Sequence, residues 1–310
     1  MSLDIATGPR DLVFAASVDS TGGVWWSPVG ESGPKDWRQC AVPQPVTRIS
    51  AAVWWPNHVM PHGRRDIFAI TRGGYPVHLI EQYGAWREDD HSTAPFGEVA
   101  PGSLTAVSAG SGASGHLEVF VVDTAGDIHH RWANDAAKGW SGWTAFSAQA
   151  DGLRATSISY CPDYDASPWQ FNLYITDPVG QIWRFPFEGT EGVWWQEAQR
   201  VPGPPAPATD VSAVSRSPGH NEIHAVTIAG DVFGAWSANS GRTWSKWERR
   251  AERTGWLTTA NGATWDADGD RAVHHNIDAG LKAVGRYTRF TDSAWRGHRD
   301  PQIPFRPGNL

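Results

Sequence analysis

Hydrophobic and polar residues alternate in short runs along this chain, and such patterns of period two predict β-strands. In the stretch HLEVFVVDTAGDIHHRWANDAAKGWSGW, residues 116–143, one alternating run covers 117–122 and a second covers 128–132. The turn sequence D-T-A-G separates the two runs, and a Trp-rich segment follows them. Two alternating runs joined by a Gly-containing turn predict a β-hairpin. No segment shows a convincing helical period, so the pattern indicates an all-β protein.

The same strand core recurs along the whole chain at intervals of 49 to 54 residues. Its equivalent positions are Phe14, Phe68, Phe120, Tyr174, His224 and Val273. A run of small residues, such as ISAAVW from Ile49, precedes most copies, and a third alternating run and a Trp-containing segment follow. Each unit therefore reads as four short strands, and repetition over the full length indicates a repeat architecture.

Four-stranded units of about 50 residues are typical of β-propeller blades. The sequence thus predicts a single domain over 1–310, an all-β six-bladed propeller around a central channel. The small residues suit the inner strands, which crowd near the axis. The predicted blades cover approximately residues 3–46, 47–101, 102–152, 153–207, 208–254 and 255–304.

Tryptophan is unusually abundant, with 19 residues against 2 methionines. Six of them fall at or near the start of a predicted fourth strand, where an indole can wedge between neighbouring blades and bury a large apolar area. These are Trp37, Trp86, Trp143, Trp195, Trp247 and Trp295. The pairs at 25–26, 54–55 and 194–195 place neighbouring indoles on opposite strand faces, so one of each pair is a candidate for stacking on a ligand.

Charge and composition exclude several function classes. The net charge of -7 and pI near 5.9 disfavour a nucleic-acid partner, and no apolar run reaches the ~20 residues that a membrane helix needs. The start, MSLDIATGPRDLVF, lacks the features of a secretory signal, which predicts a cytoplasmic protein. Cys40 and Cys161 are too few for a disulfide framework, and no nucleotide or cofactor motif is present.

Metal binding is not expected either. The doublets His129-His130 and His274-His275 cannot chelate one ion from a regular strand, because neighbouring side chains point to opposite faces. The alternating carboxylates of Asp266, Asp268 and Asp270 suggest a calcium loop, but Arg271 and Ile277 occupy the places where an EF-hand has Gly and Glu. The sequence predicts a solvated acidic turn there, with no metal and no cofactor.

The pattern of a small inner strand, an x-V-F-V strand and a segment such as KGWSGWTAF resembles the propeller lectins. These include the six-bladed fungal fucose-binding lectins and the bacterial lectins with W-S-G-W repeats. The resemblance implies sugar sites between adjacent blades, in which an Arg on the second strand and a Glu on the third clamp the hydroxyls. The segment SANSGRTW, 237–244, also resembles the Asp-box of sialidases, with Asn239 in place of Asp, and is expected to brace a turn.

The clamp positions implied by this resemblance hold other residue types here. The second-strand positions are Leu12, Asp66, Glu118, Asn172, Glu222 and Arg271. Twelve residues on, the third-strand positions are Val24, His78, His130, Arg184, Gly234 and Ala283. No blade carries the Arg and Glu pair, so repeated fucose sites of that kind are not expected.

Three hypotheses follow. The first is a lectin-like carbohydrate-binding propeller with degenerate sites. The second is a cofactor-independent enzyme for natural-product cyclisation, of the hetero-Diels–Alder type, with one asymmetric pocket at the channel mouth. Its polarising groups would be His78, His130, Arg184 and Arg271. The third is an interaction scaffold.

The expected ligand is a glycan or an apolar small molecule, and a homodimer through the outer edges is possible. The candidate ligand-binding residues are Trp25, Trp54, Asp66, His78, Glu118, His130, Trp183, Arg184, Trp236 and Arg271.

Overall fold

The fold is known from a computed structural model, which describes most of the chain in separate segments. The described residues are 3–6, 14–30, 33–34, 36–54, 64–82, 84–89, 103–111, 117–133, 139–146, 152–162, 171–190, 193–195, 197–217 and 219–251, and, as backbone alone, 261–265, 271–277, 283–289 and 296–300.

Hydrogen bonds between consecutive strands form six antiparallel sheets, which we number as blades 1–6 in chain order. Blade 1 contains β1 (Leu3–Ala6), β2 (Phe14–Val18), β3 (Val24–Gly30), β4 (Gly33–Pro34) and β5 (Arg38–Gln39). Blade 2 contains β6 (Val46–Trp54), β7 (Arg64–Thr71), β8 (Pro76–Gln82) and β9 (Ala85–Glu88). Blade 3 contains β10 (Leu104–Ser111), β11 (Leu117–Asp123), β12 (Ile128–Ala133) and β13 (Thr144–Ala145).

The second half of the ring repeats this order. Blade 4 contains β14 (Ser157–Pro162), β15 (Phe171–Thr176), β16 (Ile182–Thr190), β17 (Val193–Trp195) and β18 (Gln199–Arg200). Blade 5 contains β19 (Ala208–Ser217), β20 (His220–Thr227), β21 (Val232–Ser237) and β22 (Glu248–Ala251). Blade 6, described by its backbone, contains β23 (Asn261–Trp265), β24 (Arg271–Ile277), β25 (Ala283–Arg289) and β26 (Arg296–Asp300).

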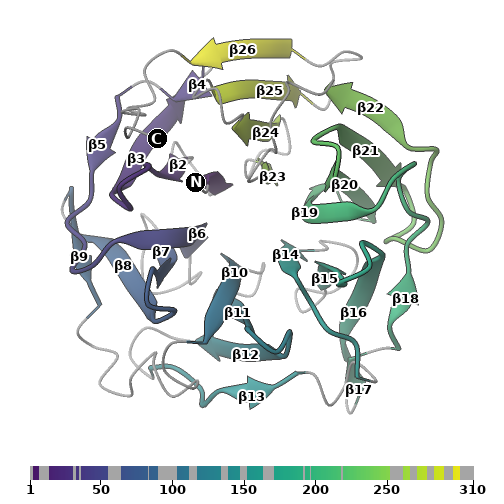
Figure 1. The fold of residues 1–310 in the computed structure, drawn as a ribbon, viewed down its shortest axis with the longest axis horizontal. Helices are drawn as coiled ribbons and strands as arrows, with labels where there is room; N and C mark the ends of the chain where they lie inside the picture. Colours follow the sequence, from purple (N-terminus) through teal and green to yellow (C-terminus); the bar gives the residue numbers. More distant parts are fainter. Residues whose placement is uncertain are drawn as a thin grey trace.

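The blades surround an axis, and the first strand of each blade is the innermost one (Figure 1). These inner strands contact their neighbours in a closed circle, from β1 through β6, β10, β14 and β19 to β23, which contacts β1 again. The predicted all-β propeller of four-stranded blades is therefore confirmed. In the part of the chain that the structure describes, no helix has the length and apolar character needed to cross a membrane.

Side-chain oxygens on the inner strands join blades 1 to 5, each to the next. Ser50 Oγ accepts a hydrogen bond from Ala109 N at 2.9 Å, and Ser108 Oγ accepts one from Tyr160 N at 2.8 Å. Ser159 does the same for the following blade, and the carboxylate of Asp4 takes this place in blade 1. An inner strand is a sheet edge with unpaired N–H groups, and these bonds satisfy them. The small residues of the inner strands thus fit into the crowded region near the axis, and some of them also hydrogen-bond to the next blade.

A turn with Gly in the left-handed region joins the second and third strands of blades 1 to 5. At Gly180 (φ 80°) an added Cβ would lie 2.5 Å from Pro207 Cβ, and Ala208 N donates to Gly180 O at 3.0 Å. This glycine is needed because its backbone touches the linker that leads into the next blade. Gly22 meets Pro45 in the same way.

The equivalence of these turns corrects one expectation. Counting back from the turn, Phe14 of blade 1 stands where Asp66 stands in blade 2, and Trp26 stands where His78 stands. The predicted positions Leu12 and Val24 are therefore two residues out of register; Leu12 itself lies outside the described residues. A strand core of three apolar residues does not fix the register, whereas the left-handed glycine does.

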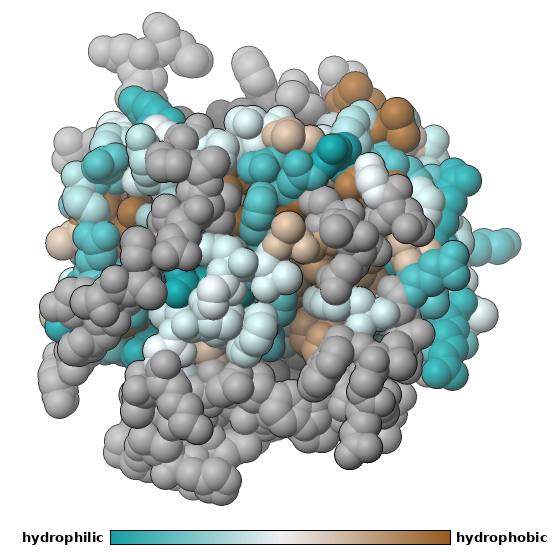
Figure 2. Space-filling view, turned by 90° about the horizontal axis from the view of Figure 1, so that it is seen from below, coloured by the Kyte–Doolittle hydropathy of each residue, from teal (hydrophilic) through white to brown (hydrophobic). Residues whose placement is uncertain are grey.

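Tryptophans do wedge between blades, as predicted. Trp86 of blade 2 packs on Phe14 and Trp26 of blade 1, with ring centroids 5.7 Å apart in both cases. Trp195 of blade 4 packs on Phe120 of blade 3 at 6.1 Å. Trp295 lies outside the described residues. Figure 2 shows the rim of the ring, where hydrophobic residues reach the surface in small patches among hydrophilic ones.

Candidate functional site

Blades 2, 3 and 4 each bury a polar pair at the two clamp positions, and the three pairs are built alike. In blade 2, His78 Nε2 lies 2.7 Å from Asp66 Oδ1; in blade 3, His130 Nε2 lies 2.6 Å from Glu118 Oε2. In blade 4, Arg184 Nε donates to Asn172 Oδ1 at 2.6 Å. The acid or amide comes from the second strand and the nitrogen base from the third. This is the reverse of the Arg and Glu order that the lectin resemblance implied.

In blade 2 the pair is enclosed by further charges. Arg64 Nη2 lies 2.7 Å from Asp66 Oδ1, and His78 Nδ1 lies 3.1 Å from Asp89 Oδ2. The His78 ring stacks on Phe68 at 4.3 Å, and Trp140 of blade 3 packs its edge against it at 5.6 Å. Asp66 and His78 are buried. The His78 imidazole thus has a carboxylate beside each ring nitrogen and the aromatic rings of Phe68 and Trp140 packed against it.

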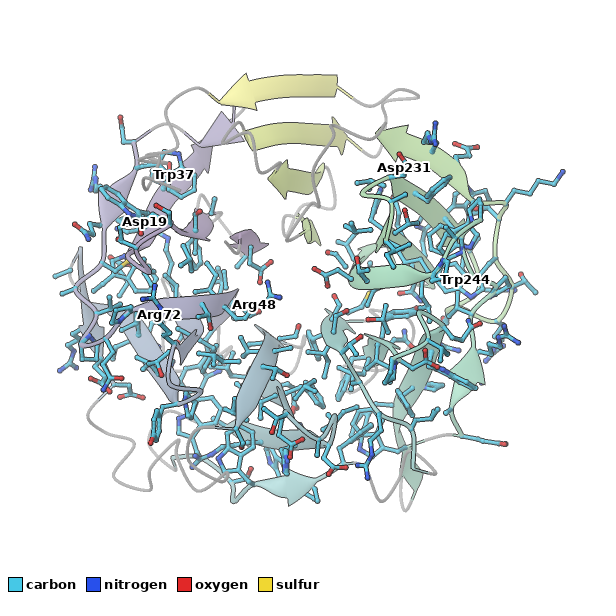
Figure 3. All side chains as sticks on the ribbon, viewed as in Figure 1. Asp19, Trp37, Arg48, Arg72, Asp231 and Trp244 are labelled. Atoms are coloured by element: carbon cyan, nitrogen blue, oxygen red, sulfur yellow. The ribbon has the colours of Figure 1, made fainter. Side chains whose placement is uncertain are left out.

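In blade 4 the pair is covered by the Asp-box-like turn of blade 5. Arg184 Nη1 donates to Gln199 Oε1 at 2.7 Å, and the backbone of Gly241 lies so close that an added Cβ would be 2.6 Å from Arg184 Nε. Trp244, labelled in Figure 3, packs against Tyr174 of blade 4 with ring centroids 6.0 Å apart. The turn lies between the third and fourth strands, as predicted, and Asn239 Oδ1 accepts a hydrogen bond from Thr243 N inside it.

Blade 3 adds an indole to its polar pair. Trp132 lies directly opposite Glu118 in the strand register, so both side chains are on one face of the sheet. The indole is partly exposed and stacks on the His130 ring at 5.4 Å. The Glu118 and His130 side chains are 9% and 11% exposed, against 0% and 1% for Asp66 and His78. The polar pair of blade 3 is therefore more open to solvent than the pair of blade 2.

Blade 5 carries the same three residue types. Glu222 lies opposite Trp236, and His224 Nε2 lies 3.7 Å from Glu222 Oε1. Trp236 reaches solvent, with 45% of the residue exposed. The ring of His220 stacks on its indole, with ring centroids 5.7 Å apart. Trp236 is the one large exposed tryptophan among the described residues.

We call Glu118, His130 and Trp132, and likewise Glu222, His224 and Trp236, the Glu–His–Trp trio. The sequence alone predicts Glu118, His130 and Trp236 as ligand-binding residues but does not join them into trios. Residues 116–143 and 220–247 align without a gap, with the Glu, the A-G-D turn, the Trp and the W-S-x-W segment in step. A direct comparison of these two stretches would have revealed the shared Glu and Trp. Only the histidine differs in position: it lies on the third strand in blade 3 and on the second strand in blade 5.

Two other predicted ligand residues make hydrogen bonds to turn carboxylates. The indole nitrogens of Trp25 and Trp183 donate to the turn carboxylates Asp19 and Asp177, at 2.8 and 3.0 Å. At Asp19, burial by itself would raise the pKa, but hydrogen bonds from Trp25, Thr21 and two backbone N–H groups hold that pKa below its ordinary value. Both indoles thus brace turns.

Trp54 is 2% exposed and packs in the core with Arg64 over its ring, so it is not available to a ligand. The side chain of Arg271 lies outside the described part, as do Asp266, Asp268 and Asp270. Among the described residues no group of His, Cys, Asp and Glu is arranged to hold a metal ion.

Two opposite charges on the inner strands β6 and β19 interact. Arg48 of β6 extends toward the open centre of the ring (Figure 3), and its charge acts on Asp210 of β19. Burial raises the pKa of Asp210, against the opposing effects of Arg48 and a hydrogen bond from Ser157. Of the predicted polarising groups, His78, His130 and Arg184 lie in three separate blades, and the side chain of Arg271 lies outside the described residues. Each of the three described groups is paired with a residue of its own blade, and this geometry does not support the single-pocket enzyme.

Comparisons with known proteins give a shared fold. No family model matches the chain, and no curated protein matches it. Among solved structures, a lectin of Aleuria aurantia bound to α-methyl-L-fucoside is 10% identical, with a TM-score of 0.68 over 96% of this chain and 93% of that one. AofleA from Arthrobotrys oligospora is 14% identical, with a TM-score of 0.70 over 96% and 86% of the two chains. The BP39L lectin from Burkholderia pseudomallei is 17% identical, with a TM-score of 0.63 over 95% and 82%. The chain therefore has the propeller fold of these lectins.

Proposed function

We propose that this protein binds carbohydrate at the two blades that carry the Glu–His–Trp trio. The observation that carries the proposal is the partly exposed Trp236 directly opposite Glu222, repeated in blade 3 as Trp132 opposite Glu118. The flat face of an indole suits the C–H face of a sugar, and neighbouring carboxylate and imidazole groups suit its hydroxyls. Two copies of one site also favour avidity for multivalent glycans.

Blade 1 supports a binding role for the polar residues. It fills the same two positions with Phe14 and Trp26, so the fold does not require a polar pair there. Buried ion pairs contribute little net stability, because desolvation offsets their attraction, and apolar replacements are often neutral. Pairs such as Glu118 and His130 are therefore better explained by ligand contact than by packing.

The trio also indicates the kind of sugar. Glu118 and Glu222 are hydrogen-bond acceptors when ionised, so they suit hydroxyl donors and repel a carboxylate. We infer that the ligand is a neutral saccharide. The similarity in fold to a fucoside-bound lectin supports a hexose-sized ligand.

The test is a glycan array with neutral and acidic glycans, followed by calorimetric titration of the best binder against Trp236→Ala. The control is Tyr75→Ala, because Tyr75 is 47% exposed, against 45% for Trp236, but lies on the β7–β8 turn of blade 2. We expect Trp236→Ala to weaken binding at the blade 5 site at least ten-fold while the blade 3 site is retained, and Tyr75→Ala to leave both sites unchanged. Retention of acidic glycans alone, or equal binding by both variants and the parent protein, would refute the proposal.

A further inference from the structure

The serine of the W-S-x-W segment makes the same two hydrogen bonds in blades 3 and 5. Ser141 N donates to Trp132 O at 2.8 Å, and Trp132 N donates to Ser141 Oγ at 3.0 Å. In blade 5, Ser245 N donates to Trp236 O at 2.8 Å, and Trp236 N donates to Ser245 Oγ at 3.0 Å. Each serine thus binds both the N–H and the C=O group of the trio tryptophan.

The tryptophans that flank the serine anchor it to other parts of the ring. In blade 5, Trp244 packs on Tyr174 of blade 4, and Trp247 Nε1 donates to Pro202 O at 2.5 Å. In blade 3, Trp140 packs on Phe68 of blade 2 at 5.8 Å. The serine is therefore fixed at both ends by contacts with the preceding blade or linker, and it offers the third strand a rigid partner.

This bond meets the strand where regular pairing has ended. The register between β21 and β22 reaches Val232, Phe233 and Gly234, so Trp236 lies beyond the last strand pair. In blade 3 the β12–β13 register covers His129 and His130 and likewise stops short of Trp132. Without the serine, the outer side of each trio tryptophan would have no sheet neighbour among the described residues.

We propose that Ser245 and Ser141 are positioning residues that set the orientation of the trio indoles for the ligand. The inference rests on the proposed carbohydrate-binding function for its use, but the positioning itself is a property of the free protein. The side chain of Lys246, the next residue in the motif, is exposed and provides a matched position that makes no such bond.

The experiment compares Ser245→Ala, Ser245→Thr, Lys246→Ala and Trp236→Ala by iodide quenching of tryptophan fluorescence in the free protein. The Trp236 contribution is the difference between the parent protein and Trp236→Ala. We expect the iodide quenching attributed to Trp236 to differ from the parent value in Ser245→Ala. It should return to the parent value in Ser245→Thr, because the hydroxyl remains, and it should be unchanged in Lys246→Ala. Affinity for the neutral glycan should fall about five-fold in Ser245→Ala, the effect of one net hydrogen bond.

The outcomes separate the two proposals. If quenching in Ser245→Ala equals that of the parent protein, the positioning inference is wrong, whatever the binding result. If quenching changes while Trp236→Ala still binds glycan normally, the positioning stands and the proposed function fails. An equal loss of thermal stability and affinity in Ser245→Ala and Ser245→Thr would also overturn the inference, because it would indicate a packing role for the site.

Discussion

The inner-strand serines allow a test of what joins the blades. Ser50 donates to Asp4 Oδ2 at 2.8 Å and accepts from Ala109 N at 2.9 Å, so it links blades 1, 2 and 3. Ser17 of β2 is equally buried, at 1% against 2% exposed, but its hydroxyl has no hydrogen-bond partner among the described residues. Replacing each serine with alanine removes one hydroxyl from a similar environment, and the two changes differ in the bonds that are lost.

The magnitude follows from these bonds. Ser50→Ala leaves Ala109 N buried without an acceptor, which costs about 1–3 kcal/mol, and removes a charge-assisted bond to Asp4. We expect the free energy of unfolding to fall by about 2–4 kcal/mol, or roughly 3–6 °C in melting temperature for a chain of this size. Ser17→Ala removes an unsatisfied buried hydroxyl and should change stability by less than about 1 kcal/mol, with either a neutral or a stabilising effect.

The assay is urea denaturation followed by tryptophan fluorescence, together with differential scanning calorimetry. The parent protein and both variants should unfold with the same dependence on urea, so that midpoints report stability. A Ser17→Ala variant that loses as much stability as Ser50→Ala would refute the reasoning, because loss of volume rather than of hydrogen bonds would then explain both. A Ser50→Ala variant as stable as the parent protein would show that the inner edges do not need these acceptors.

Three further predictions concern turns, acid and the thiols. Gly180→Ala should destabilise the protein more than Gly152→Ala in thermal melts, because both glycines have positive φ but only at Gly180 would a Cβ meet Pro207. Because the pKa of Asp19 is lowered in the folded protein, its charged form stabilises the fold at pH values above the ordinary pKa of 3.8, and this stabilisation is lost as the pH falls below that value. The parent protein should therefore exceed Asp19→Asn in free energy of unfolding by more at pH 6 than at pH 3. Burial raises the pKa of the Cys40 thiol, so alkylation at pH 8 should be slow in the native protein and fast after unfolding.

The repeat and the propeller followed from the sequence because they depend on many weak signals that agree. Each blade contributes alternating strands, a glycine turn and a tryptophan, so an error in one blade does not change the architecture. The register of blade 1 depends on a single alignment, and there Leu12 was chosen where Phe14 belongs. The glycine turn was the better reference, since its left-handed conformation is fixed by the backbone.

The candidate site was predicted in its parts. Asp66, His78, Glu118 and His130 were singled out at the clamp positions that the lectin resemblance implies, and the structure pairs them across neighbouring strands. The sequence did not reveal which pair is enclosed, because closure depends on residues far along the chain, such as Trp140 over His78. Contacts of this kind arise from the ring geometry and leave no local pattern.

Each sheet is built from strands that are consecutive in the chain, and among the described strands no sheet combines members of the first and last blades. The ring is therefore closed by non-covalent contacts, which β1 makes with β23 and β24 and β4 makes with β26, while every other junction also has a covalent linker. A junction that holds without a linker shows that chain continuity is not what joins neighbouring blades. It follows that the order in which the blades are threaded can be permuted: joining the two ends and opening any one linker, such as that before β19, preserves every sheet and every neighbour.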